Sequence, residues 1–101
     1  MEELEKILEL AGIKEGYYAN QQSNVEFSTL HDQKKNLFTS IKENIIEKME
    51  KLSDEKIHFI SLLIEKDMVV IAKSEHKIVA AIGDKNINLG LVKIQMMKLV
   101  S

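Results

Sequence analysis

The sequence predicts an α+β fold in which a five-stranded antiparallel sheet carries helices on both faces. Three segments repeat apolar residues with the helical period, and five shorter runs are rich in residues that favour strands. The later strand-like runs lack regular polar alternation, which indicates that both faces of the sheet are covered. The predicted order is helix, strand, strand, helix, three strands, helix. No linker or repeat divides the chain, so we predict one domain over residues 1–101.

The first helix is predicted from residue 2 to about residue 10, because its apolar residues recur at i, i+3 and i+4. Gly12 is the expected C-terminal stop, since glycine adopts the left-handed conformation without a Cβ clash. Two β-prone runs follow at 17–19 and 25–29. The polar segment 20–24 between them predicts a hairpin turn.

A long helix is predicted from about Gln33 to Leu52, with Asp32 or Thr29 as its N-cap. At about 100° per residue, most of its apolar side chains form one continuous stripe that should face the sheet. The members of that stripe are Leu37, Phe38, Ile41, Ile45, Met49 and Leu52. Ile46 falls roughly 60° outside the stripe, among polar residues, and packing onto its own sheet should leave it exposed.

Three β-branched runs at 56–64, 68–73 and 78–82 are joined by segments of hairpin length, so they predict a three-stranded antiparallel meander. The last helix is expected at 89–100. Asn88 directly precedes it and is a favourable N-cap residue.

Composition excludes several classes of function. The chain has no Cys, which rules out a disulfide framework, a Cys-ligated metal site and thiol catalysis, and suits a reducing cytoplasm. A net charge of -2 argues against nucleic acid as a partner, because phosphate binding uses clustered cationic side chains. No apolar run approaches the roughly 18 to 20 residues that span a bilayer, so membrane insertion is not expected.

No catalytic or cofactor-binding constellation emerges from the motifs. His31 and Asp32 are adjacent, and adjacent residues seldom face each other as a catalytic pair must, so we interpret them as a solvated junction between a strand and a helix. His58 and His76 lack the spacing of a local metal-ligand pair. The four glycines form no phosphate-binding loop. We therefore expect no cofactor, no metal and no enzymatic activity.

The element order and the last third of the chain resemble the Roadblock / dynein light chain family of profilin-like sandwich proteins. Three features carry this resemblance: the segment 11–13 with Gly16 at the entry to the first strand, the meander 60–82, and the sequence Asn-Leu-Gly-Leu at the start of the last helix. The family-like motif residues are Asn88, Leu89, Gly90 and Leu91.

Membership would imply a homodimer that binds a Ras-like small GTPase, or a light subunit of a larger complex. It would also place the third strand at an edge of the sheet. Residues 57–64 would then form a long, nearly uncharged edge, and pairing with a second copy across a two-fold axis would remove that aggregation hazard. The residues assigned to this dimer or partner interface are Thr39, Lys42, Ile46, Glu50, Ile57, Phe59 and Ser61.

Two other classes of function stay open at this point. A small-ligand sensory domain of PAS-like fold would share the sandwich, although its pockets are usually apolar and rich in aromatic residues, and this chain has five. An enzyme would need a cleft with convergent titratable groups, for which the sequence gives no indication.

Overall fold

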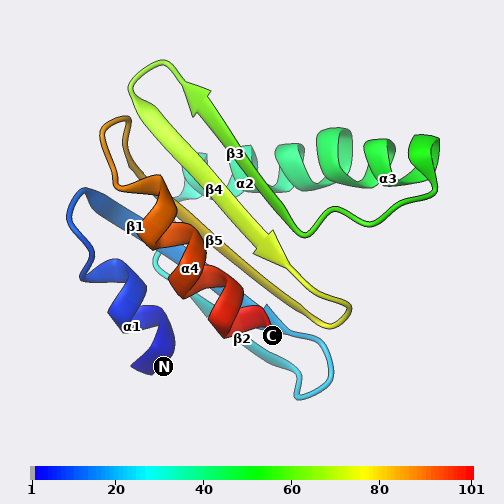
Figure 1. Ribbon diagram of the computed structural model, residues 1–101, viewed down its shortest axis with the longest axis horizontal. Helices are drawn as coiled ribbons and strands as arrows, with labels where there is room; N and C mark the ends of the chain where they lie inside the picture. Colours follow the sequence, from blue (N-terminus) through cyan, green and yellow to red (C-terminus); the bar gives the residue numbers. More distant parts are fainter. Residues whose placement is uncertain (1) are drawn as a thin grey trace.

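A computed structural model describes residues 2–101, and its regular elements follow the predicted order (Figure 1). The elements are α1 (Glu2–Leu8), β1 (Ile13–Asn20), β2 (Val25–Ser28), α2 (Asp32–Ile41), η1 (Lys42–Ile46), α3 (Glu47–Ser53), β3 (Phe59–Ile64), β4 (Asp67–Lys73), β5 (Lys77–Asp84) and α4 (Leu89–Val100). The segments α2, η1 and α3 form one continuous helix, of which η1 is a π-helical turn. Within the described residues, no helix is long and apolar enough to cross a membrane.

The strands form one antiparallel sheet in the order β2-β1-β5-β4-β3. The predicted hairpin and the predicted three-stranded meander are therefore both present, and β1 joins them by pairing with β5. β3 lies at one edge and β2 at the other. This confirms the edge position that the family resemblance implies for the third strand.

Helices cover both faces of the sheet, as predicted. α1 and α4 lie on one face, and the long helix α2–η1–α3 crosses the other (Figure 1). In β4, Val70 and Ala72 belong to the core under α1 and α4, whereas Val69 and Ile71 belong to the core under α2. Both neighbours in the strand are buried because both faces are covered, which explains the absence of polar alternation.

The π-helical turn overturns the prediction for Ile46. The Glu47 amide donates a hydrogen bond to the Lys42 carbonyl, five residues earlier, in place of the usual four. This extra residue in the turn places Ile46 on the same face as Ile41, and its side chain is 1% exposed. The predicted exposure of Ile46 was therefore wrong, because the calculation assumed an uninterrupted period of 3.6 residues.

The same shift, together with the length of the helix, exposes two residues of the predicted stripe. Met49 is 52% exposed and Leu52 is 89% exposed, and no residue of α3 is buried. In Figure 1 the α3 end of the long helix extends past β3, beyond the edge of the sheet. The sheet is therefore too narrow to cover the apolar face of α3.

Several predicted boundaries also move. α1 ends at Leu8, so Gly12, with φ of +87°, lies in the turn into β1 instead of stopping the helix. A Cβ on Gly83 would lie 2.5 Å from the Gly12 carbonyl oxygen, which ties both glycines to the close approach of these two segments. β3 begins at Phe59, so the predicted edge 57–64 is shorter, and Ile57 lies in the preceding loop.

Candidate functional site

The candidate interface consists of the unpaired outer edge of β3 and the exposed end of α3. Met49 and Leu52 lie on α3. Leu63, which is 57% exposed, lies on β3 and points to the opposite face of the sheet. Water contacts these large apolar side chains at the part of the fold where the backbone of an edge strand lacks a partner. Sequence reasoning placed Met49 and Leu52 in the core and missed them as surface residues. The signal that could have found them is the length of a helix that outruns the sheet.

The structure distributes the sequence-predicted interface residues over several surfaces instead of one. Thr39 is exposed on α2, and Lys42 is half-buried at the start of η1. Ile57 is half-buried in the loop before β3. Phe59 and Ser61 are paired with Ala72 and Val70 of β4, so their side chains point to the side of the sheet on which α4 lies. Phe59 and Ser61 are both half-buried.

Glu50 has an intramolecular role. Its Oε2 atom accepts hydrogen bonds from Lys73 Nζ and from the Ile57 amide, both at 2.7 Å. The bond from Lys73 is the main reason why the pKa of Glu50 lies below its ordinary value. Glu50 therefore fastens α3 to β4 and to the loop before β3, which holds the exposed end of the helix in position. Ile46, which is buried, has no surface with which to reach a partner.

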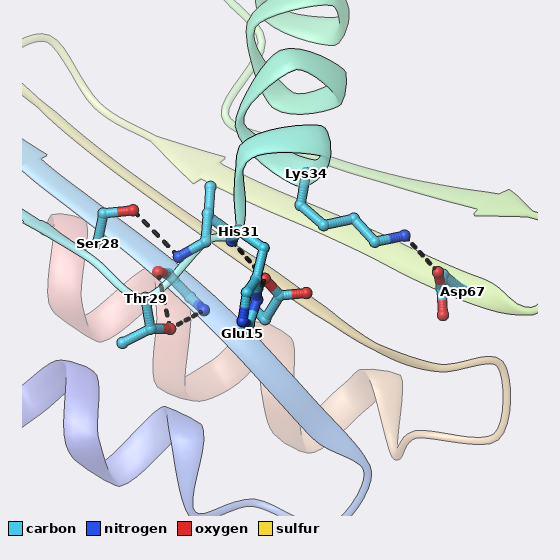
Figure 2. Close-up of polar contacts among 8 residues, drawn as sticks. Glu15, Ser28, Thr29, His31, Lys34 and Asp67 are labelled. Carbon is cyan, nitrogen blue, oxygen red and sulfur yellow. Dashed lines mark hydrogen bonds and ion pairs between the residues drawn. The ribbon is translucent and has the colours of Figure 1, made fainter.

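A polar cluster fixes the other end of the long helix (Figure 2). His31 is the N-cap residue of α2, in place of the predicted Asp32 or Thr29, and its own side chain caps nothing. Glu15 of β1 anchors this residue: its Oε1 atom accepts from the His31 amide at 2.7 Å and lies 2.7 Å from His31 Nδ1. The His31 side chain is 85% exposed, which agrees with the predicted solvated junction between a strand and a helix. The carboxylate that contacts His31 is that of Glu15, not that of the adjacent Asp32.

Burial and hydrogen bonding act in opposite directions on Glu15. Burial alone raises the pKa of this carboxyl, but the bonds from the His31 amide and ring, together with nearby charge such as that of Lys34, lower it by more, so the net pKa lies below the ordinary value. Next to it, Lys34 of α2 donates to Asp67 of β4 at 2.7 Å, which holds the pKa of Asp67 below its usual range. Figure 2 shows both contacts bridging the first turn of α2 to the sheet.

Replacing Glu15 with alanine should lower the free energy of unfolding by about 1–3 kcal/mol at pH 7, the usual cost of leaving a partly buried amide without its hydrogen-bond acceptor. The folded-state pKa of Glu15 is depressed, so its stabilisation is present above pH ~4.3 and is lost as pH falls through the folded pKa. Urea denaturation at pH 7 and pH 3 should show the gap between wild type and Glu15→Ala shrinking. Glu43→Ala, at an exposed position of η1, is the control and should change stability less.

The family-like motif at the start of α4 has a structural role. Asn88 is the N-cap, as predicted, and its side chain accepts from the Leu91 amide at 3.1 Å. Leu89 packs against the core under α4, and Gly90 and Leu91 are exposed. Of the motif, Asn88 and Leu89 therefore position α4 on the sheet.

An open groove of about 890 Å³ lies on the α2 face of the sheet, where the long helix leaves the ends of β1 and β5 bare. Tyr17, Ala19 and Ile78 belong to its lining, together with Lys42 and His58. Burial and a 2.7 Å hydrogen bond to Glu26 raise the pKa of Tyr17 to about 12, so this hydroxyl stays protonated. Within residues 2–101, no group of three or more His, Asp or Glu side chains could hold a metal ion.

The sheet order and the helices on its two faces define the class: this is the fold of the Roadblock/LC7 domain. No family model matches the sequence, and no curated protein matches it. The solved Roadblock/LC7 domain from Streptomyces avermitilis superposes with a TM-score of 0.68 at 5% identity, covering 92% of this chain and 83% of that one.

Particular proteins of this fold include two MglB structures. MglB from Myxococcus xanthus is similar with a TM-score of 0.66 at 15% identity, covering 92% of this chain and 75% of that one. The gliding protein MglB from Thermus thermophilus is similar with a TM-score of 0.65 at 16% identity, covering 93% of this chain and 77% of that one. At these identities the similarity establishes the fold.

Proposed function

We propose that this chain is a non-catalytic, homodimeric interaction module that binds a Ras-like small GTPase or serves as a light subunit of a larger assembly. The observation that carries the proposal is the exposed apolar end of α3 beside the unpaired edge of β3. The Roadblock resemblance supplies the partner class. The non-catalytic part of the proposal is supported by the charged side chains of the described residues. Glu15 and Glu50, for example, make short hydrogen bonds that hold elements of the fold together.

A second copy of the chain would satisfy both parts of this surface. Pairing of two β3 edges across a two-fold axis would give their outward amides and carbonyls hydrogen-bond partners. The same axis would bring each α3 towards the other protomer, where Met49 and Leu52 could be buried. A stable interface of this kind should bury more than ~1,000 Å² in total.

The experiment combines light scattering with a Ras-like GTPase from the same organism, loaded with a non-hydrolysable GTP analogue. We expect the chain alone to give twice its mass of 11.6 kDa at micromolar concentration. We expect the GTPase to co-elute with that dimer. A single-chain mass would contradict the dimer, and a dimer that binds none of the Ras-like GTPases of its host would contradict the GTPase assignment alone.

Stimulation of a bound GTPase should be modest. The chain contains no Arg, so it cannot insert an arginine finger, the device that is worth ~10³ to 10⁵ in turnover. Lysine is a poor substitute because it lacks the planar bidentate fork. Single-turnover hydrolysis should therefore accelerate well below ~10³-fold. A larger acceleration, abolished by replacing one lysine while binding persists, would contradict this reasoning.

A small-ligand sensory role is the second candidate, and the groove beside Tyr17 is the observation that favours it. The groove is open and most of the residues that line it are polar or charged, whereas sensory pockets are usually enclosed and apolar. A metabolite that raises the melting temperature of wild type, and not that of Ala19→Trp, would favour this role.

A further inference from the structure

The face of β3 that points to the α1/α4 side is left without a helix. Phe59, Ser61 and Leu63 lie on this face, because each pairs directly with a β4 residue that packs under α1 and α4. α4 lies over β4 and β5, and in Figure 1 no helix lies in front of β3. Leu63 is accordingly 57% exposed, although it belongs to an apolar strand.

Dimerisation through β3, as proposed above, would turn this bare strand into a channel. The inference rests on that proposal. Two paired β3 strands would be flanked by β4 on each side, and the two copies of α4 would stand over the β4–β5 pairs. The axes of the two α4 helices would then be about four strand spacings apart, or ~19 Å.

That separation admits one further α-helix. Packed helices lie about 8–10 Å apart, so a helix centred between the two copies of α4 would contact both at the ordinary distance. Its floor would be Phe59, Ser61 and Leu63 from each protomer. An occupant with an apolar stripe would bury the two Leu63 side chains, which the dimer alone leaves in water.

The walls of the channel indicate the charge of the occupant. Lys93 of α4 lies beside β3, with its Nζ atom 5.1 Å from the centre of the Phe59 ring. Lys93 and Lys98 are the charged residues of α4, which has no carboxylate. The two-fold axis would place one Lys93 on each side of the channel. Acidic side chains on both sides of the apolar stripe of a bound helix would then contact these two lysines.

We propose that the β3 dimer binds one acidic amphipathic helix of a partner protein, seated between the two copies of α4. The site lies on the face of the sheet opposite α2, so its occupation is compatible with a second partner on the α2–α3 side. The expected stoichiometry is one helix for two chains, because a single channel spans the two-fold axis.

The test uses a labelled helical peptide of about 18 residues with leucines at helical spacing and glutamates flanking them, and a matched peptide with lysines in place of the glutamates. The acidic peptide should saturate at one per two chains, and the lysine peptide should bind at least tenfold more weakly.

Lys93→Glu should reverse that preference, and Leu63→Glu should weaken binding of the acidic peptide at least ~30-fold. Leu91→Glu is the control: Leu91 is similarly apolar and exposed, but lies ~200° around α4 from Lys93, and should leave affinity within twofold.

Light scattering on each variant separates this inference from the proposed dimer. A single-chain mass for wild type would overturn both. A two-chain mass with no peptide binding, with one peptide per chain, or with equal affinity for both peptides would overturn the helix channel alone. A four-chain particle for wild type that becomes a two-chain particle on Leu63→Glu would also overturn the helix channel, since a second dimer would then occupy this face of β3. If Leu63→Glu itself dissociates the dimer, the proposal is tested by Lys93→Glu alone: reversal of the preference for the acidic peptide supports it, and an unchanged preference overturns it.

Discussion

Replacing Ile46 with glutamate is expected to unfold the domain. Ile46 is 1% exposed and packs in the core under the long helix with Ile71 and Ile82. A carboxylate there would lie among buried apolar side chains, and an unpaired buried charge costs roughly 3–5 kcal/mol. A domain of this size has only about 5–15 kcal/mol of stability. Circular dichroism should show either loss of the fold at about 25 °C or a melting temperature lowered by more than ~10 °C.

Met49→Glu is the matched control, because it introduces the same charge one helical turn later at a position that is 52% exposed. Its melting temperature should stay close to that of wild type when both are measured as monomers. If Ile46→Glu instead folds normally and only loses partner binding, then Ile46 is on the surface, and the π-helical register of η1 is contradicted.

Replacing Leu52 with glutamate is expected to leave the monomer folded and to break the dimer. Leu52 is 89% exposed in the single chain, so the substitution costs the monomer little. In the dimer each copy would lose about 1.5–3 kcal/mol of apolar burial. The two copies together correspond to a dissociation constant raised ~10² to 10⁴-fold. Sedimentation equilibrium measures this directly.

The control for Leu52→Glu is Leu91→Glu, which puts the same charge on an exposed leucine of α4, on the opposite face of the sheet. It should leave the dissociation constant unchanged. Equal two-chain masses for wild type and Leu52→Glu at every concentration would place the interface elsewhere and remove α3 from it.

Local pattern was sufficient to predict most of the fold. The β-branched runs between turn-length segments predicted β3, β4 and β5, and Asn88 correctly predicted the start of α4, because strand propensity and capping depend on neighbouring residues. The side-by-side pairing of β1 with β5 depends on residues about 60 positions apart, such as Tyr18 and Val79. Periodicity alone does not contain that information.

The errors share one physical origin, which is that contacts from other elements decided the outcome. The π-helical turn contains one extra residue, and this shift in register allows both Ile41 and Ile46 to be buried. A helical wheel drawn at about 100° per residue does not include such a shift. The start of α2 is held by Glu15, 16 residues before the N-cap residue His31, so a search for Ser, Thr, Asp or Asn beside the helix missed this contact.

The candidate site was predicted only in part. The edge position of β3 followed from the family resemblance, and the apolar character of that strand was evident in the sequence. The exposure of Met49 and Leu52 was not, because it depends on where a helix ends relative to the width of the sheet beneath it. The role of Glu50 as an internal anchor likewise depends on Lys73 of β4, a contact across 23 residues.

Pairing of β3 with its own copy is tested most directly by disulfide trapping, for which the chain is suited because it contains no native cysteine. Cysteines introduced one at a time from Phe59 to Ile64 should give a two-chain product on mild oxidation at the positions nearest the two-fold axis, where the Cα atoms come within about 7 Å. Cysteines at Val25 and Phe27, on the opposite edge strand β2, should give none. Trapping at β2, or at no position of β3 in a protein that sediments as a dimer, would contradict the pairing of β3 with its own copy.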